Sequence, residues 1–196
     1  NVENTQGLIA VFGASRMGLQ GYLPIAQFEP KHDGVKIVSG LTSTDLPDQW
    51  IALQSLDAIV WSDAEPILQS NQKRALLNWI YRGGHFVIVL PAIGNPWSLN
   101  TAQNAIPELL NNIQPTSGLA SMRELDGIVG RQFRWPSFQM PIKSFGYDYQ
   151  DWGDDTPLLT LDDGRVVAFQ RNYGFGAISI IGIDLMSETN VLYPKL

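Results

Sequence analysis

Cysteine is absent from the sequence, which excludes disulfide bonds, thiolate nucleophiles and metal sites with cysteine ligands. The absence of cysteine is compatible with the bacterial cytoplasm and with the periplasm, so it does not distinguish between these two locations. Clustered positive charge is also missing: the formal net charge is −6, and the longest basic stretch is the pair Lys73 and Arg74. Because contacts to nucleic-acid phosphates need clustered Lys and Arg, we expect no nucleic acid among the partners.

Long apolar runs are missing too. A membrane-spanning helix needs roughly 18 or more consecutive apolar residues, whereas the longest run here, Phe86 to Ala92, has the length of a strand. The chain begins with Asn1 rather than with methionine, so we expect it to be either an excised fragment or a processed product of a longer chain. Any membrane attachment is therefore expected only through flanking segments outside this sequence.

What the sequence does contain is the composition of a folded globular domain. Apolar residues make up 44% of the 196 residues and charged residues 16%, which supplies enough apolar material for a buried core. The sequence shows no internal repeat, low-complexity tract or linker. We therefore expect a single domain over residues 1–196, with an irregular insertion near residues 114–152.

Short apolar runs alternate with a helical pattern in the first half of the chain. Ala75, Leu76, Trp79 and Ile80 recur at helical spacing, and Ser70 is the expected N-cap. The apolar run after this helix is continuous, which is typical of strands covered on both faces. The sequence therefore predicts an α/β fold, a three-layer sandwich with a mainly parallel central sheet. The expected elements are strands over residues 7–13, 35–39, 57–61 and 85–92 and a helix over residues 70–82.

The second half of the chain has a weaker pattern. Residues 101–113 predict a helix, and residues 114–152 predict an irregular or small β-rich excursion. The Asp-Asp-Gly sequence at residues 162–164 stands between two apolar runs, which is a strong signal for a β-hairpin. A last strand is expected over residues 177–184. We therefore expect a C-terminal β-hairpin beside the main sheet.

The glycines after the first expected strand invite comparison with a nucleotide-binding loop. If Gly13 takes the first position of the short-chain dehydrogenase pattern TGxxxGxG, the next two glycines are required at Met17 and Leu19, and Gly18 is out of register. The Met17 side chain then stands where a pyrophosphate needs to lie. No Gly-Lys-Ser/Thr sequence follows, and no tyrosine has a lysine four residues later. We therefore expect no nucleotide cofactor, and a nucleotide-dependent oxidoreductase is the least favoured function.

The segment from Leu46 to Pro96 carries a resemblance to a known family. It leads from a tryptophan-containing turn through LDAIVWSD and NWIYRGG to HFVIVL, and the C-terminal YGFGAISIIGIDLMSE continues the pattern. This pattern resembles the class I glutamine amidotransferase-like domain, in a divergent form found in bacterial membrane-associated proteins. The resemblance implies a flavodoxin-like α/β domain. It also implies a location in the bacterial periplasm or anchored to the envelope, with the cytoplasm as the alternative.

The catalytic elbow of that family implies a vacated active site here. Active members place a nucleophilic Cys in a G-x-C-x-G elbow after the strand that matches HFVIVL, and a His-x-Glu sequence after the last core strand. Ala92 stands at the Cys position and Met186 at the His position, so only Glu188 remains. A methyl group cannot attack a carbonyl, and a thioether cannot take a proton. The resemblance therefore implies a non-catalytic ligand-binding or protein-interaction domain.

We expect a ligand pocket at the edge of the sheet where the parallel strands end, because α/β domains bind their ligands there. The expected partner is a small ligand or a protein. The alternative function is a hydrolase that uses carboxylates at this edge as acid and base. The candidate pocket residues are Gly13, Ser15, Arg16, Asp63, Glu65, Ala92, Gly94 and Glu188.

Metal-ligating residues are few. His32 and His85 are the only histidines, and we expect a solvated turn for the first and a structural role for the second. Four aspartates fall within residues 148–155, but their spacing does not match the EF-hand loop. We favour a solvated acidic turn over a Ca²⁺ site for these residues. No metal and no other cofactor is expected.

Overall fold

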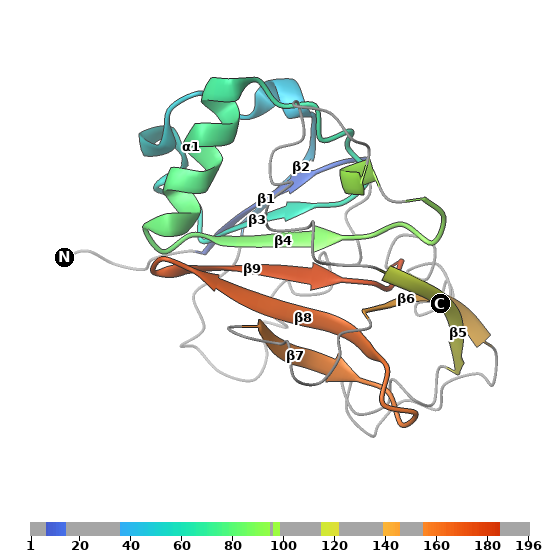
Figure 1. Ribbon diagram of the computed structural model, residues 1–196. Coiled ribbons are helices and arrows are strands. Elements are labelled where there is room, and N and C mark those ends of the chain that lie inside the picture. The colour runs from blue at the N-terminus through green and yellow to red at the C-terminus, as the bar shows by residue number, and fades with distance from the viewer. Residues whose placement is uncertain are drawn as a thin grey trace, which may run out of the picture.

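The computed structural model of the protein describes residues 7–14, 36–94, 96–98, 115–121, 139–145 and 155–184. These residues form one sheet of nine strands and one α-helix, so the fold is α/β with much more strand than helix (Figure 1). The helix is α1 (Ser70–Tyr81), and the short 3-10 helices are η2 (Ser43–Asp45), η3 (Trp50–Leu53) and η4 (Pro96–Ser98). The strands are β1 (Leu8–Phe12), β2 (Lys36–Leu41), β3 (Ala58–Trp61), β4 (His85–Val89), β5 (Pro115–Ser121), β6 (Gln139–Phe145), β7 (Asp155–Thr160), β8 (Val166–Tyr173) and β9 (Gly176–Ile181).

The sheet has a parallel half and an antiparallel half. Its strand order is β2-β1-β3-β4-β9-β8-β6-β5, and β7 pairs with β8 beside this path. The pairs among β2, β1, β3, β4 and β9 are parallel, whereas those that include β8, β7, β6 or β5 are antiparallel. The prediction of a mainly parallel sheet is therefore wrong for half of the strand pairs. The physical reason is that the turns after β7 and β8 are short, and a parallel return needs a crossover of about a dozen residues or more.

The predicted strands of the first half are confirmed, because β1 to β4 fall on the four apolar runs. The predicted hairpin is also confirmed, since β7 and β8 pair around the Asp-Asp-Gly turn. α1 buries the four predicted apolar residues, but its N-cap is Gln69, and Ser70 is its first helical residue. The N-cap prediction is wrong by one residue. The carboxamide of Gln72 reaches back to accept the Gln69 backbone N–H at 3.0 Å, which closes the first turn one residue earlier.

α1 covers one face of the parallel half, where aromatic rings fill the core. Trp61 is fully buried, with its ring stacked on Phe12 at a centroid distance of 4.6 Å and edge-on to Trp97 at 5.5 Å. Such ring pairs add about 0.5–1.5 kcal/mol beyond the burial of their area. Phe12 and Trp61 are the last residues of β1 and β3. The aromatic core therefore fixes the ends of these two strands.

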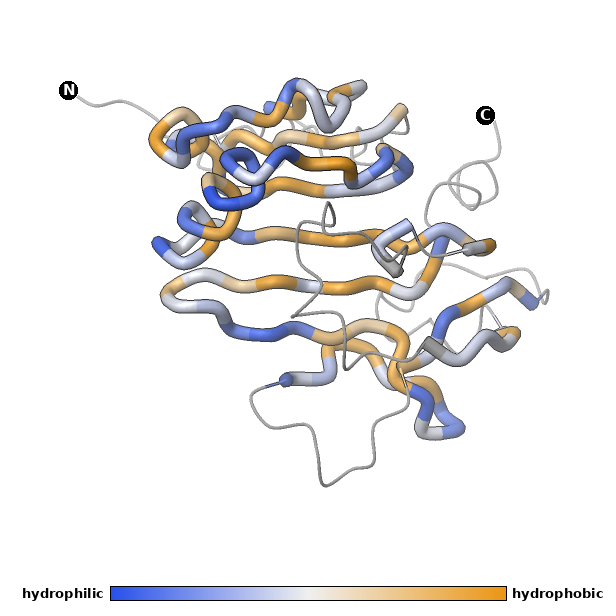
Figure 2. The backbone as a smooth tube through the Cα atoms, turned by 45° about the horizontal axis from the view of Figure 1, so that its top comes forward, coloured by the Kyte–Doolittle hydropathy of each residue, from blue (hydrophilic) through white to orange (hydrophobic). Residues whose placement is uncertain are grey.

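The opposite face of the parallel half is buried as well. Val11, Val60 and Val89 form a separate apolar cluster there. Figure 2 shows apolar residues along most of the length of the central strands, whereas the second half of β8 is hydrophilic. Burial on both faces explains why the parallel strands have continuous apolar sequences rather than alternating ones.

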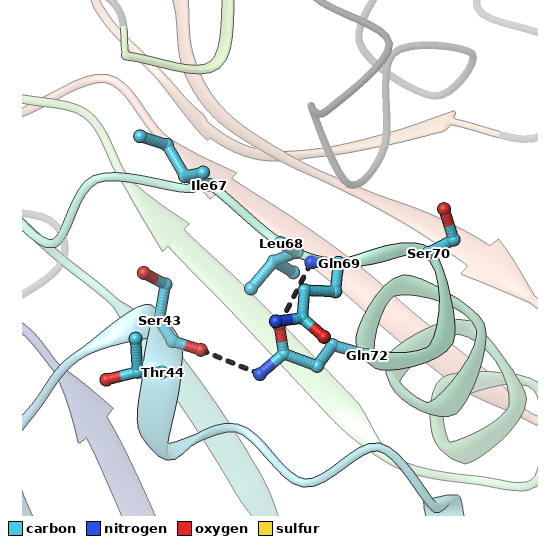
Figure 3. Close-up of a pocket in the computed structure, with 7 residues that line it drawn as sticks. All are labelled: Ser43, Thr44, Ile67, Leu68, Gln69, Ser70 and Gln72. Carbon is cyan, nitrogen blue, oxygen red and sulfur yellow. Dashed lines mark hydrogen bonds between the residues drawn. The ribbon is translucent and has the colours of Figure 1, made fainter.

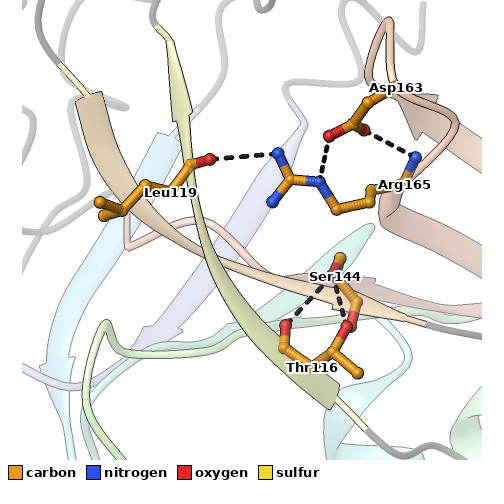
Figure 4. Close-up of polar contacts among 5 residues, drawn as sticks. All are labelled: Thr116, Leu119, Ser144, Asp163 and Arg165. Carbon is orange, nitrogen blue, oxygen red and sulfur yellow. Dashed lines mark hydrogen bonds and ion pairs between the residues drawn. The ribbon is translucent and has the colours of Figure 1, made fainter.

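Polar pairs across neighbouring strands hold the antiparallel half together. Asp155 of β7 stands opposite Arg171 of β8, and Nε and Nη2 of the guanidinium each donate to its carboxylate at 2.6 Å. Thr116 of β5 and Ser144 of β6 also stand opposite each other and exchange hydrogen bonds (Figure 4). Arg165, from the turn after β7, donates to a backbone carbonyl of β5 at 3.1 Å. These contacts reinforce the backbone pairing of β7 with β8 and of β5 with β6, whereas β6 and β8 share only one backbone pair.

Three strands form the margins of the sheet: β2, β5 and β7. The register between β1 and β2 shifts after Ala10, which marks a bulge. β5 begins with Pro115, and β7 contains Pro157. The sheet thus ends in irregular or proline-containing strands.

Part of the predicted second half lies outside the described residues, including the predicted helix over residues 101–113. Of the predicted excursion over residues 114–152, the described parts are β5 and β6, and both belong to the end of the main sheet. The β-rich character of this region is as predicted. In the described part of the chain, no helix has the length and apolar character needed to cross a membrane.

Candidate functional site

The parallel strands end at one edge of the sheet, which we name the carboxyl edge and define as the residues that follow β1, β3, β4 and β9. The order β2-β1-β3-β4-β9 corresponds to the flavodoxin-like order 2-1-3-4-5. In domains with this order, ligands bind where the strand order reverses, beyond the ends of the first and third strands. The topology therefore places a candidate site between the ends of β1 and β3.

The side chain of Asp63 joins these two strand ends. Its Oδ1 accepts hydrogen bonds from the Ala14 backbone N–H and from the Ser62 hydroxyl, each at 2.9 Å. Gly13 has a φ of +132°, and a Cβ at this residue would lie 2.0 Å from the same oxygen. Only glycine fits beneath this carboxylate. Two predicted site residues, Gly13 and Asp63, are thus brought together, in a contact that holds the backbone.

The segment after β4 forms a bend at Ala92 and Ile93, at the carboxyl edge, where the family resemblance implies the catalytic elbow. The backbone N–H of Ala92 donates to Oδ2 of Asp184 at 3.1 Å. Asp184 follows β9, which is the strand next to β4. Gly94 ends the bend with a φ of +76°. The carboxylate of Asp184 therefore closes the bend against the neighbouring strand.

Lys143 of β6 supports the same bend from the antiparallel half. The residue is only 5% exposed, and its Nζ donates to the carbonyl oxygens of Pro91 and Gly94. Burial lowers the pKa of the Lys143 amine, and the negative charge of Asp184 acts against this by raising it. An amine that binds two carbonyls and a carboxylate that binds an N–H therefore fix the backbone from Pro91 to Gly94.

A cavity of about 520 Å³ opens between η2 and the start of α1 (Figure 3). Gln72 connects its two walls, because Nε2 donates to the Ser43 carbonyl at 3.1 Å while Oε1 accepts from the Gln69 N–H at 3.0 Å. Gln72 therefore fixes the two walls of the cavity relative to each other, and the walls offer hydroxyl and amide groups but no charged side chain. The lining residues are Ser43, Thr44, Ile67, Leu68, Gln69, Ser70 and Gln72.

The remaining predicted site residues do not join these contacts in the described structure. Glu65 is exposed, two residues after Asp63. Ser15, Arg16 and Glu188 lie outside the described residues. The structure therefore brings the predicted residues together as two separate pairs, Gly13 with Asp63 and Ala92 with Gly94.

The two charged residues that hold the bend after β4 were missed by sequence reasoning. Lys143 is a single lysine within MPIKSF, and a buried amine needs partners, so its position among apolar residues is the available signal. Asp184 directly follows the last strand and therefore reaches the carboxyl edge. The comparison with the family's His-x-Glu sequence directed attention to Glu188 instead.

In the part of the chain that the structure describes, no group of three or more His, Asp or Glu residues is arranged to hold a metal ion. Asp155, the last aspartate of the acidic run, lies in β7 and is bound to Arg171, while the other three aspartates of that run lie outside the described residues. Nε2 of His85 lies 2.8 Å from the Ser179 hydroxyl, between β4 and β9. Burial lowers the pKa of the His85 imidazole. His85 therefore occupies the structural position that was expected.

The sequence matches no protein-family model and no curated protein sequence. Solved structures do show a similar fold. The Cytoplasmic Protein STM1381 from Salmonella typhimurium LT2 is similar with a TM-score of 0.60 and 11% identity, over 97% of this chain and 94% of that chain. The mmIFT52 N-terminal domain is similar with a TM-score of 0.56 and 13% identity, over 92% of this chain and 87% of that chain.

An exo-beta-1,4-mannosidase, Op5Man5 from Opitutaceae bacterium strain TAV5, is similar with a TM-score of 0.54 and 11% identity. The match covers 96% of this chain but only 33% of the mannosidase. This chain therefore spans about a third of that enzyme. At these identities the likeness shows the fold alone, and function has to be argued from the site.

Proposed function

We propose that this chain is a non-catalytic binding or interaction domain built on an amidotransferase-like framework. The hydrogen bond from the Ala92 N–H to Asp184 carries the proposal. In acyl-transfer enzymes, backbone N–H groups at the turn of the nucleophile stabilise the oxyanion of the intermediate. At the corresponding turn of this chain, residue 92 has a methyl group instead of a nucleophile, and its N–H is bound to a carboxylate of the chain itself.

The other charged groups of the carboxyl edge support the same proposal. Asp63 accepts from Ala14 and Ser62, and Lys143 donates to two carbonyl oxygens of the bend. A general base needs a lone pair directed at the substrate, and a nucleophilic lysine needs a free amine. The carboxylate of Asp63 beside the Ala14 N–H also repels a pyrophosphate at the start of the glycine loop. These contacts favour a structural use of the edge over hydrolysis or nucleotide chemistry.

The proposal includes the three-layer sandwich that the sequence predicts. Burial of Val11, Val60 and Val89 on the face opposite α1 supports it, because apolar side chains on a second face need a covering layer. The proposal also includes the location at the bacterial envelope that the resemblance implies. The alternative is the cytoplasm, the location in the name of one structural neighbour. Fractionation of cells that express the full gene product distinguishes the two locations.

The absence of catalysis is tested by measuring turnover. The purified chain and the variants Asp184→Asn and Lys143→Met are incubated with glutamine and with p-nitrophenyl acetate, and the release of ammonia and p-nitrophenol is followed. We expect no rate above that of buffer for any of the three proteins. Asp163→Asn is the matched control, because it removes an exposed carboxylate from the hairpin turn. Turnover that Asp184→Asn or Lys143→Met abolishes, and that Asp163→Asn retains, would replace this proposal with a hydrolase.

The binding role is tested by a thermal-shift screen of small metabolites. A ligand at about 100 times its dissociation constant stabilises the folded state by about 2.7 kcal/mol, which raises the melting temperature. Amide chemical-shift changes in a ¹⁵N-labelled sample then locate each ligand that stabilises the chain. We expect changes at residues 62–65, 69–72 and 90–94. Stabilising ligands that perturb only other surfaces would contradict a site at the carboxyl edge.

A further inference from the structure

A second surface rich in aromatic residues lies at the opposite edge of the sheet, where α1 ends and β4 begins. η3, the end of α1 and the turn between β8 and β9 form it, and the last two lie side by side in Figure 1. Trp, Tyr and Arg are the residue types that contribute most of the binding energy in protein interfaces. We name this the amino-edge surface and define it as Trp50, Tyr81, Arg82 and Phe175.

Direct contacts connect these residues into one surface. The backbone N–H of Phe175 donates to the Tyr81 carbonyl at 2.9 Å, which attaches the β8–β9 turn to the end of α1. The ring of Tyr81 lies 6.1 Å from that of Tyr173. On the other side of Tyr81, the guanidinium carbon of Arg82 lies 4.1 Å from the ring centroid of Trp50. The contacts therefore run without a break from η3 to the β8–β9 turn.

Two large aromatic side chains of this surface are exposed. Phe175 is 88% exposed and Tyr81 is 56% exposed. A phenyl group in water lacks the stabilisation that its burial would supply. Tight turns favour Gly, Asn, Asp, Pro and Ser, so the turn itself has no need of phenylalanine. The exposed ring of Phe175 is therefore available for contact with a partner.

A pocket of about 290 Å³ lies within this surface. Its apolar wall includes the ring of Trp79, which packs flat against the backbone of Gly84, where a Cβ would lie only 2.3 Å from the ring. The pocket is large enough for one apolar side chain, and Arg82 stands at its rim. The lining residues are Trp50, Gln54, Leu56, Asp57, Trp79, Arg82, Gly83 and Gly84.

Arg82 determines the charge of the partner that this surface suits. Among the described residues no carboxylate forms an ion pair with Arg82, and Asp57, the acidic residue of the pocket, accepts the Leu8 backbone N–H at 2.6 Å. The position of the guanidinium carbon over the Trp50 ring is a cation–π contact, and a guanidinium can at the same time donate hydrogen bonds to a carboxylate. Because the guanidinium is already positioned, less side-chain entropy is lost on binding.

We propose that the amino-edge surface binds an acidic peptide segment of a partner protein. A carboxylate of the segment pairs with Arg82, and a neighbouring large apolar side chain enters the pocket against Trp79. Phe175 and Tyr81 cover the segment from the side of the β8–β9 turn. The net charge of −6 opposes long-range attraction of an acidic partner, so specificity rests on the local pairing with Arg82. This inference is independent of the carboxyl edge and of its proposed function.

The test selects peptides from a phage-displayed library of random linear peptides on the whole chain. Enriched peptides are synthesised with a fluorescent label and titrated with the wild type, Arg82→Gln and Phe175→Ser. We expect the enriched sequences to contain Asp or Glu beside a large apolar residue. Loss of one charge-assisted pair corresponds to weakening by about tenfold for Arg82→Gln. Phe175→Ser is expected to weaken binding severalfold.

Two control variants separate this pairing from general effects of charge and hydrophobicity. Arg74→Gln removes the same charge from the middle of α1, and Leu158→Ser removes an apolar side chain that is 52% exposed on β7. Both are expected to keep the wild-type affinity, and circular dichroism verifies that every variant is folded. Failure to enrich any peptide overturns the proposal, as do enriched peptides without an acidic residue or equal binding by Arg82→Gln. Self-association that Phe175→Ser abolishes would assign the surface to a second copy of the chain instead.

Discussion

The two halves of the sheet are held together by different interactions. In the parallel half, apolar and aromatic side chains are buried on both faces, with Trp61 at the centre of the larger cluster. In the antiparallel half, an ion pair between Asp155 and Arg171 and hydroxyl contacts between Thr116 and Ser144 connect neighbouring strands. The antiparallel half also has an apolar cluster of its own, so cavities are expected to destabilise both halves. Loss of polar cross-strand partners is expected to act mainly on the antiparallel half. One continuous sheet thus contains two parts that respond to different substitutions.

The largest effect is expected for Trp61→Ala in the parallel half. Trp61 is fully buried, and its ring contacts Phe12, Phe86 and Trp97, while its Nε1 donates to the Ala64 carbonyl at 2.7 Å. Truncation of such a side chain leaves a cavity and lowers the free energy of unfolding by about 4 kcal/mol. Urea denaturation followed by circular dichroism measures the change. Trp50→Ala, at a half-buried tryptophan, is the control, and an equal loss in the two variants would refute the central role of Trp61.

The largest effect in the antiparallel half is expected for Asp155→Asn. The side chain of Asp155 is 3% exposed and that of Arg171 is 20% exposed, so the substitution removes a carboxylate from a mostly buried guanidinium. We expect the free energy of unfolding to fall by about 3 kcal/mol. This is the lower end of the range for breaking a buried ion pair, because Arg171 keeps some contact with water. The same denaturation experiment measures it. Asp162→Asn in the exposed turn is the control, and the double variant with Arg171→Met should recover part of the loss.

A smaller and local effect is expected for Ser144→Ala. Ser144 is 3% exposed, and its hydroxyl donates to the Thr116 carbonyl at 3.1 Å. Loss of this hydrogen bond lowers the free energy of unfolding by about 1 kcal/mol. Hydrogen exchange should show faster exchange in β5 with little change in the parallel strands. Ser117→Ala changes an exposed residue of β5 and is expected to leave hydrogen exchange in β5 unchanged. Faster exchange throughout the sheet would contradict the separation of the two halves.

The smallest effect is expected from titration of His85 in the parallel half. Because burial lowers the pKa of His85 below its usual 6.5, the unfolded chain binds a proton at pH values where the folded chain does not. The free energy of unfolding therefore decreases as the pH falls from 6.5 toward the folded-state pKa. His85→Gln should reduce this slope, and urea denaturation between pH 7 and 5 measures it. An unchanged slope in the variant would show that other groups cause the dependence.

The parallel half could be predicted from the sequence because burial on both faces produces continuous apolar runs. β1, β3 and β4 were located in this way, as was the apolar side of α1. The antiparallel half is harder to predict, because its strands combine polar cross-strand partners with only part of an apolar face. β6 contains a proline and a buried lysine, and neither is typical of a strand until its partners are known.

The candidate site could be predicted only in its position. The carboxyl edge follows from the strand order, and the tight turn at Ala92 follows from a proline and glycine after an apolar run. Ala92 and Asp184 are 92 positions apart in the sequence, and Pro91 and Lys143 are 52 positions apart. These contacts therefore depend on which strands become neighbours in the folded chain. A single sequence does not contain that information. The amino-edge surface was missed for the same reason, since η3, α1 and the β8–β9 turn meet only in the folded chain.

The strands at the margins of the sheet also bear on how this protein behaves at high concentration. A free strand edge can recruit a strand from another molecule, and this templating leads to polymers and amyloid-like fibres. Pro157 in β7 and Pro115 in β5 lack the N–H group that an incoming strand would bind, and the bulge between β1 and β2 twists the remaining margin. The sheet therefore carries its own obstacles to growth at these margins, and we expect them to slow the recruitment of further strands.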